Sequence, residues 1–304
     1  MITGQVGIFA LGDAAHGFFE FSLLPDVDPR AMACAIESTR EPRSTVGGVN
    51  RVIGFRPSLW RKLAPGGSPP GLHDFESAIR GPDGYVIPAT QADVWVWLAA
   101  ASYDIVFDLG KAAVENLSPY AKLVREVRGW SYRHNRDLTG FEDGTKNPTL
   151  DQAPEIALVD DTKPGAGGSV LLFQMWRHDG NAFHDLPEKT QEQVIGRTKE
   201  GSVELEGAAM PDDSHVERTT IREGESELKI FRRNVPYGTV EDHGTLFIGF
   251  SGEQARMHRM LEQMAGIGGP RDALTRYTTA LTGAYYFVPS IQALRQFAPP
   301  EDDD

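Results

Sequence analysis

The feature that most constrains the fold is a strand that leads directly into an amphipathic helix, and it occurs once in each half of the chain. In the first half, a predicted strand over residues 93–99, apolar from residue 94 on, precedes a helical pattern over 103–117. In the second half, residues 245–250 precede a helical pattern over 252–265. Alternating apolar residues indicate strands, whereas a spacing of three to four indicates helices. The two halves are therefore predicted to share one order of elements.

That order is β-α-β-β-α-β, which is typical of a ferredoxin-like unit. In the first half we expect strands near residues 4–11, 18–24, 49–55, 92–101 and 122–132, with helices near 28–40 and 103–117. In the second half we expect strands near 168–177, 227–234, 244–250 and 284–288, with helices near 187–199 and 252–265. The predicted fold class is α+β, a duplicated ferredoxin-like fold (β-α-β-β-α-β twice) with antiparallel sheets and packed helices.

The domain organisation follows from this repeat. Residues 1–134 are the expected N-terminal ferredoxin-like half, and residues 168–298 are the C-terminal one. Residues 135–167 carry few periodic apolar positions and are interpreted as a linker, although a long irregular segment inside a compact protein is often functional. Residues 299–304 begin with two prolines and continue with four acids, which predicts a solvated acidic tail.

Charge and composition exclude several classes of protein. The 30 basic and 43 acidic residues give a formal net charge of -13, which argues against nucleic acid or an anionic membrane as a partner. No apolar stretch approaches the ~20 residues that a membrane-spanning helix needs. The N-terminal residues show no secretory signal, so we expect a cytoplasmic protein. The single cysteine, Cys34, cannot form an internal disulfide.

The segment from Gly140 to Pro148 is the most unusual in the chain, because two glycines, Gly140 and Gly144, flank Glu142 and Asp143. Glycines permit a positive φ and a close approach of the backbone to a flat ligand, and such a loop can aim a carboxylate at that ligand. The alternative is an ordinary turn, because Asp-Gly and Asn-Pro are common turn dipeptides.

Two further segments carry candidate functional groups. His215 lies among acids and hydroxyl side chains, which can orient a metal-bound imidazole, but any one of eight histidines is more often an ordinary surface residue. Arg232 and Arg233 are adjacent on a predicted strand, so they must point to opposite faces and one of them can enter a pocket. The alternative there is a strand end with paired surface charges.

Several common signatures are absent. The sequence has no phosphate-binding loop, no Gly-X-Ser-X-Gly nucleophile elbow and no His-Glu-X-X-His zinc helix, which removes the main support for nucleotide hydrolases, serine hydrolases and common zinc peptidases. It also has no Cys-X-X-Cys-His motif for covalently attached haem.

Taken together and in this order, residues 140–144, residues 212–219 around His215, and residues 232–238 resemble the dye-decolorizing peroxidase family, particularly its bacterial short-chain, B-type-like members. The resemblance covers nearly the whole chain, including the ending over residues 279–289. Three separated motifs at compatible spacing make a coincidence improbable, whereas each alone is weak.

The resemblance implies a haem-dependent peroxidase (EC 1.11.1.-) whose helices pack around a pocket for haem b (iron protoporphyrin IX). Its partners would be hydrogen peroxide, reduced through a ferryl intermediate, and an organic electron donor such as a dye or a phenolic. The family also suggests a homo-oligomer. Position by position, the resemblance implies that His215 is the iron ligand and that Asp272 is the hydrogen-bond partner of this ligand. On the peroxide side, Asp143 would be the catalytic acid, and Arg232 and Asn234 would form a polar pair. Arg197 would contact a haem propionate.

These residue types suit the chemistry. A positioned carboxylate can move a proton between the two peroxide oxygens, and a permanently charged guanidinium can stabilise the departing hydroxide. Other readings remain open: a deferrochelatase-like enzyme that handles haem, a non-catalytic haem carrier, or a non-haem iron site. His184 and His258 are the next candidate ligands. We expect bulky donors to pass electrons through a surface aromatic residue, for which the candidates are Trp176, Tyr237, Tyr285 and Tyr286, although core packing is the alternative for most of them.

Overall fold

The structure, a computed structural model, describes residues 3–39, 48–133 and 135–298. The expected acidic tail, residues 299–304, lies outside the described residues. The main strands are β1 (Ala15–Leu23), β2 (Asn50–Phe55), β5 (Val94–Ala100), β6 (Ala121–Trp130), β7 (Ser169–His178), β10 (Phe231–Arg232), β11 (Val235–Gly238), β12 (His243–Ser251), β13 (Thr278–Ala280) and β14 (Ala284–Val288). The helices are α1 (Pro29–Glu37), α2 (Pro57–Leu63), α3 (Tyr103–Leu117), α4 (Ala153–Ala157), α5 (Gly180–His184), α6 (Glu188–Ile195), α7 (His215–Thr219), α8 (Gln254–Met264) and α9 (Ile291–Arg295). Two short hairpins are formed by β3 (Ile79–Arg80) with β4 (Val86–Ile87) and by β8 (Arg222–Glu223) with β9 (Ser226–Glu227).

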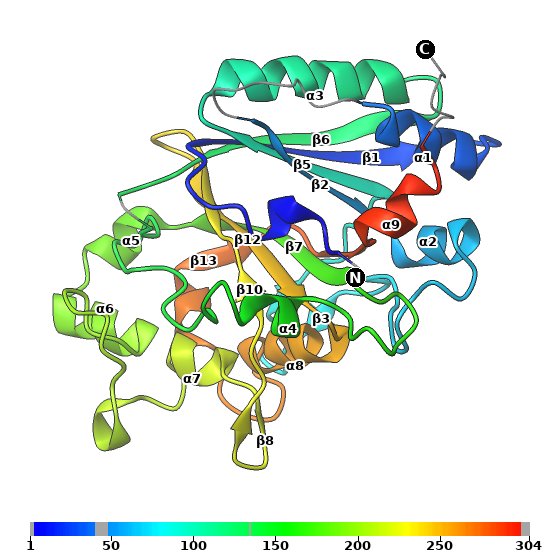
Figure 1. Cartoon of the computed structure of the whole chain (residues 1–304). Coiled ribbons are helices and arrows are strands. Elements are labelled where there is room, and N and C mark those ends of the chain that lie inside the picture. Colours follow the sequence, from blue (N-terminus) through cyan, green and yellow to red (C-terminus); the bar gives the residue numbers. More distant parts are fainter. Residues whose placement is uncertain (1–2, 40–47, 134, 299–304) are drawn as a thin grey trace.

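All the main strands belong to one antiparallel sheet that closes on itself (Figure 1). The first half contributes β6-β1-β5-β2 and the second half contributes β11-β12-β7-β14, each in spatial order. Two junctions join these sets, and each rests on a single residue pair: Phe55 with Phe287, and Gly129 with Tyr237. The result is a barrel-like sheet in which β10 and β13 are short additions.

Strand alternation divides the core between the inside of the barrel and its outer faces. On β5, Trp95 and Trp97 point inward and contact Phe18 from β1 and Phe173 from β7. The intervening residue, Val96, belongs to the outer core under the helices. Side chains alternate across a strand, so the neighbours of the inward aromatic residues on β7 and β12 face outward.

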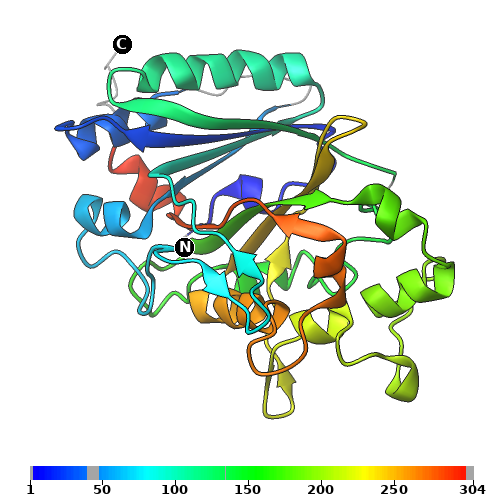
Figure 2. The same cartoon turned by 180° about the vertical axis from the view of Figure 1, so that it is seen from behind.

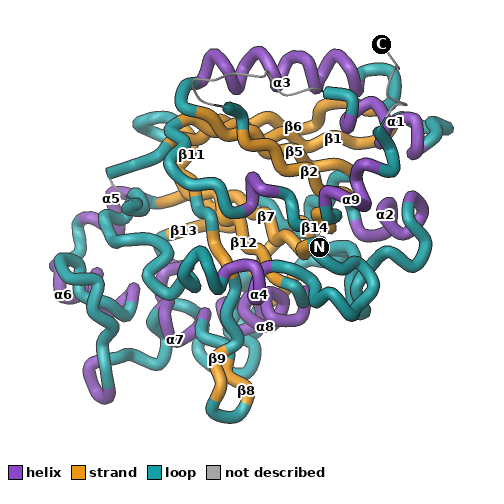
Figure 3. The backbone as a smooth tube through the Cα atoms, in the orientation of Figure 1, coloured by secondary structure: helices purple, strands orange, loops and turns teal. Residues whose placement is uncertain are grey.

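Helices cover the two outer faces unequally. The long helix α3 lies along the sheet of the first half, whereas α8 lies under the sheet of the second half (Figure 1). Seen from behind, the β3–β4 hairpin lies beside the chain that leads to β14 (Figure 2), and Thr90 just after it donates its N–H to the carbonyl of Gly283 over 2.9 Å. The second half also carries long loops with the short helices α5, α6 and α7 (Figure 3). Among the described residues, no helix is long and apolar enough to cross a membrane.

The predicted mixture of helices with an antiparallel sheet is confirmed, and α3 and β14 match their predicted ranges. The ferredoxin-like assignment and the duplication stay predictions. The prediction of a strand near residues 4–11 is wrong, because the chain forms a short 3-10 helix at Val6–Ile8. There the side-chain amide of Gln5 pairs with both backbone groups of Ile53 on β2, over 2.8 and 2.9 Å, and so takes the place of a neighbouring strand.

Two other boundaries differ from the prediction. The strand expected near residues 227–234 is confirmed only in part, because β10 covers Phe231–Arg232 alone. The side chain of Asn234, which accepts the N–H of Ile248 over 3.4 Å, lies between β10 and β11. The helix expected near residues 187–199 ends at Ile195, because Gly196 has a φ of 93°, which only glycine adopts readily.

Candidate active site

A cavity lies against the outer face of β7 and β12. It encloses about 1100 Å³ of empty space, part of which is open to solvent. Strand alternation turns Trp176 of β7 and Phe247 of β12 outward into it, and α8 adds Met260 and Met264. The cavity therefore has one broad apolar wall, which suits a flat apolar ligand.

His215 is the first residue of α7 and lines this cavity. The buried Ser214 precedes it and caps the helix by accepting the N–H of Glu217. The imidazole Nδ1 of His215 lies 2.7 Å from Oδ2 of Asp272, which is fully buried. An ionised carboxylate only accepts hydrogen bonds, so Nδ1 carries the proton and Nε2 keeps its lone pair for a ligand.

Asp143 reaches the same cavity from the loop that follows β6. Its backbone N–H donates to the carbonyl of Asn135 over 2.9 Å, and the next residue, Gly144, has a φ of 73°. A side chain at Gly144 would be strained and would meet Nδ2 of Asn147 at 3.0 Å. The loop conformation therefore depends on this glycine and holds the Asp143 carboxyl group at the cavity.

The surroundings of Asp143 act on its carboxyl group in opposite directions. Burial raises the pKa of Asp143 above its ordinary value, the positive charge of Arg232 opposes that rise, and the negative charge of Asp137 adds to it. Asn234 donates from Nδ2 to Oδ1 of Asp143 over 3.1 Å and so fixes the orientation of the carboxyl group. The net result is a carboxyl group that holds its proton to a higher pH than an exposed aspartate.

Arg232 lies at the end of β10 and lines the cavity, whereas the adjacent Arg233 points away and stacks over Trp97 at 5.0 Å. Within the described part of the chain, the guanidinium of Arg232 has no hydrogen-bond or ion-pair partner, which leaves its donors available to a ligand. The backbone of Arg232 is held by Asn147, whose side chain accepts its N–H over 3.0 Å and donates to its carbonyl over 2.8 Å.

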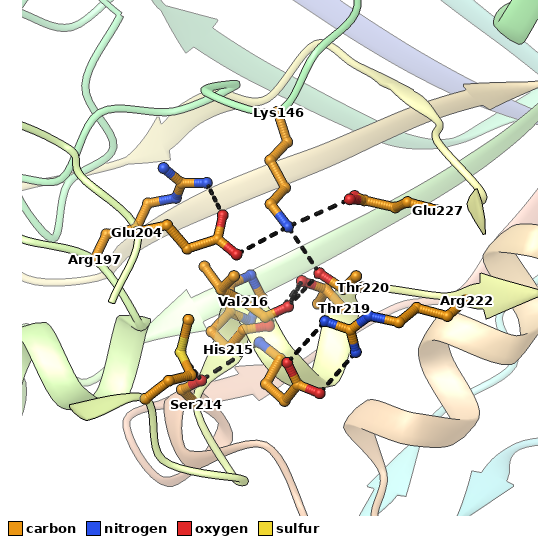
Figure 4. Close-up of polar contacts among 12 residues, drawn as sticks. Lys146, Arg197, Glu204, Ser214, His215, Val216, Thr219, Thr220, Arg222 and Glu227 are labelled. Atoms are coloured by element: carbon orange, nitrogen blue, oxygen red, sulfur yellow. Dashed lines mark hydrogen bonds and ion pairs between the residues drawn. The ribbon is translucent and has the colours of Figure 1, made fainter. Parts of the chain in front are cut away.

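Arg197 also lines the cavity, and its guanidinium is already paired (Figure 4). It contacts Oε2 of Glu204 and the carbonyl of Ser202, each over 2.7 Å. Glu204 also pairs with Lys146 over 3.3 Å, and Lys146 reaches Glu227 over 3.6 Å. The cavity mouth near His215 thus carries a connected network of two cations and two carboxylates.

The other candidates from the sequence lie elsewhere. His184 is exposed, and His258 on α8 contacts the hydroxyl of Tyr285 over 3.3 Å; neither lines the main cavity. All four aromatic candidates are core residues, each at most 7% exposed. The expected surface position is therefore wrong for them, and core packing, the alternative favoured for most of them, is confirmed. Of those four, Trp176 lines the cavity.

Sequence reasoning missed several residues that the fold brings to the cavity. Asp137 lies in the same loop as Asp143, and its carboxylate accepts the hydroxyl hydrogen of Thr245 on β12. Lys146 and Asn147 follow the Gly144 turn and reach the network at the mouth and the backbone of Arg232. The signal available was the density of polar residues over 135–147, which the assignment of a linker did not use.

Comparisons with known proteins identify the family of this chain. The family described as Dyp-type peroxidase, N-terminal, matches residues 34–131, and Dyp-type peroxidase, C-terminal, matches residues 134–293. The chain belongs to the Dyp-type peroxidase family. As a Dyp-type peroxidase it is an enzyme, and the family predicted from its three motifs is confirmed.

Similar curated proteins are dye-decolorizing peroxidases. The protein from Rhodococcus erythropolis is 34% identical over 266 residues, which cover 85% of this chain and 76% of the relative. The protein from Mycobacterium tuberculosis is 33% identical over 270 residues, which cover 83% of this chain and 80% of the relative. A deferrochelatase from Yersinia pestis is 24% identical over 180 residues, or 50% of this chain and 41% of the relative.

Solved structures of Dyp-type peroxidases resemble this one along nearly its whole length. The protein from Shewanella oneidensis has a TM-score of 0.90 at 29% identity and covers 98% of this chain and 100% of its own. A DypB variant from Rhodococcus jostii in complex with haem has a TM-score of 0.87 at 34% identity and covers 94% of this chain and 96% of its own.

Proposed function

We propose that this peroxidase holds haem b in the cavity with His215 as the iron ligand, reduces hydrogen peroxide and oxidises organic donors such as dyes and phenolics. The observation that carries the proposal is the meeting of His215, Asp143 and Arg232, from three distant segments, in one cavity with an apolar wall. The haem in the related DypB structure supports it.

The residues present fit such a group. The imidazole of His215 keeps one unprotonated nitrogen, and the carboxylate of Asp272 makes that nitrogen a stronger donor to a metal. The apolar wall of Trp176, Phe247 and Met260 suits a porphyrin face. Cys34 lies on α1 and not at the cavity, so a noncovalent group is expected. By contrast, no three His, Cys, Asp or Glu side chains in the described ranges are grouped to hold a metal alone.

Each polar residue has a separate task in peroxide reduction. When bound, haem would supply the redox chemistry that cleaves the O–O bond. Asp143, in its ionised form, takes the proton from one peroxide oxygen and gives it to the other peroxide oxygen, which then departs. Arg232 stabilises the negative charge on the departing oxygen, and Asn234 keeps the Asp143 carboxyl group in place. Two electrons from organic donors and two protons complete the conversion of one peroxide into two water molecules.

Two roles at the edge of the cavity belong to the same proposal. Arg197 would pair with a haem propionate, and that pairing would compete with its contact to Glu204. Gly144 would let the loop backbone approach the porphyrin. Self-association, a cytoplasmic location and the boundaries near residues 134 and 168 stay predictions. A deferrochelatase-like reaction would use the same cavity, and its product, free porphyrin, can be assayed after incubation with haem.

The two residues on the peroxide side are expected to contribute differently. Arg232 is charged at every working pH, so Arg232→Leu should slow the reaction with peroxide about 100-fold to 1,000-fold from pH 4 to 8. Asp143 acts only when ionised, and burial raises its pKa, so the wild-type rate should fall on the acid side. Asp143→Ala should mainly remove this acid limb. The measurement is the second-order rate of the absorbance change with peroxide.

Arg80→Leu is a control for charge, because Arg80 is exposed and does not line the cavity. An unaffected rate in Arg232→Leu together with a collapsed rate in Asp143→Ala at all pH values would reverse the two roles.

A further inference from the structure

A second acid shares the space around Asp143. Asp137 lines the main cavity with Asp143, and both also line a smaller cavity with about 440 Å³ of empty space, part of it open to solvent. Polar side chains, including those of Asn135, Asn234 and Thr245, form much of its wall. A space of this size can hold water, so the two carboxyl groups face one hydrated compartment.

Asp137 sits in a set of donors that favours its ionised form. Its Oδ1 accepts the N–H of Thr139 over 2.7 Å, and its Oδ2 accepts the hydroxyl hydrogen of Thr245. The Thr245 oxygen also lies 3.1 Å from Nε2 of His178. Since the single hydroxyl hydrogen goes to Asp137, Nε2 of His178 must be the donor. The hydrogen bonds therefore run from His178 through Thr245 and end on the Asp137 carboxylate.

The two acids consequently differ in charge. Burial alone would raise the pKa of Asp137, but His178, Thr245 and Thr139 lower it below its ordinary value. Asp143 has one side-chain donor among the described residues, Asn234, and its pKa lies above the ordinary value. Asp137 thus ionises first and presents a negative charge to Asp143.

The other ionisable groups around the two cavities do not replace this charge. Burial and the charge of Arg233 lower the pKa of His16 to about 4, so His16 is neutral over the upper part of the range from pH 4 to 8. Burial also lowers the pKa of His178; the negative charge of Asp137 opposes this effect, and the charges of His243 and His184 add to it. The other ionisable residues that line the cavities are Arg136, which binds backbone carbonyls, Arg232, the exposed Glu142, the paired Lys146 and Arg197, and His215, which contacts Asp272.

We propose that Asp137 is a positioning residue for Asp143: its fixed negative charge, maintained by Thr245 and His178, keeps the proton on Asp143 into a higher pH range. The switch of Asp143 between acid and base then lies nearer the working pH, where a proton-transfer group is most effective. This inference rests on the proposed role of Asp143.

The test compares Asp137→Asn with wild type in the haem-loaded protein over pH 4 to 8. Removing the negative charge should make Asp143 ionise at lower pH, so the acid limb of the peroxide rate moves to lower pH. Each unit of movement raises the rate at the acid end about tenfold. Cyanide association is a second readout without turnover, because hydrogen cyanide must also lose its proton in the pocket, and its acid limb should move in parallel.

Three variants make the result decisive. In an Asp143→Asn background, Asp137→Asn should not move the pH profile of the peroxide rate further. Asp108→Asn controls for the change in net charge, because Asp108 is exposed. Thr245→Val removes the hydroxyl donor without removing the acid, and it should move the limb in the same direction by less. This variant keeps the test available if Asp137→Asn folds poorly.

The outcomes separate the two claims. An acid limb that stays in place or moves to higher pH in Asp137→Asn, while Asp143→Asn abolishes it, would overturn the role of Asp137 and leave that of Asp143 intact. A limb that persists in Asp143→Asn would instead refute the proposed role of Asp143.

Discussion

Asn147 connects the two segments that carry Asp143 and Arg232, the residues proposed for the peroxide side. Its side-chain amide bonds both backbone groups of Arg232, while its own loop carries Asp143. Asn147→Ala leaves two partly buried backbone groups without these partners, and we expect a loss of about 1–3 kcal/mol of unfolding free energy, with a slower peroxide reaction because Arg232 shifts. Urea denaturation and the peroxide rate measure both effects. Asn147→Asp keeps the acceptor and should lose less; equal stability of Asn147→Ala and wild type would contradict this role.

The candidate site was predictable as far as residue type and order could indicate it. His215, Asp143 and Arg232 were found because each lies in a recognisable segment, and the structure brings them to one cavity. Asp137 and His178 were missed, because their importance depends on Thr245, which lies over 100 residues from Asp137 in the sequence. A hydrogen-bond chain assembled from three segments leaves no local pattern.

At the scale of elements, the position of α7 depends on how α6 ends. Gly196 has a φ of 93°, and a Cβ there would lie 3.0 Å from Ser214 and from Val216, the neighbours of His215. We expect Gly196→Ala to cost about 1–3 kcal/mol and to weaken haem binding by displacing α7. Gly84→Ala is the matched control, because Gly84 has a φ of 86° but no neighbour within 4 Å. The measurements are urea denaturation and haem titration; equal haem affinity of the two variants would contradict the packing argument.

Elements with a clear period were predictable, and short ones were not. Helix α3 has a well-defined apolar face over 15 residues, and β5 is an uninterrupted apolar run. Helix α7 has five residues, too few for a helical period to emerge, so its N-cap Ser214 was the available signal. Between β10 and β11 lies the side chain of Asn234, whose contact with Ile248 a pattern of apolar residues does not reveal.

At the scale of the whole molecule, the two halves share one interior. Each junction of the sheet has a single residue pair, but Phe18 and Trp95 of the first half pack against Phe173 and Tyr286 of the second. We therefore expect residues 1–134 expressed alone to lack cooperative unfolding and to bind an apolar dye, because the inner face of the sheet is uncovered. Circular dichroism during urea denaturation measures this. A sharp, cooperative transition would show that the first half is an independent domain.

The proposed function depends on His215 as the ligand of a bound haem. The most direct measurement is the absorption spectrum of His215→Ala after loading with haem and gel filtration, beside wild type, His184→Ala and His258→Ala. We expect wild type and both controls to retain an intense Soret band and peroxidase activity, because neither control residue lines the cavity. His215→Ala should lose tight haem and activity. A normal Soret band with normal turnover in His215→Ala would contradict the assignment.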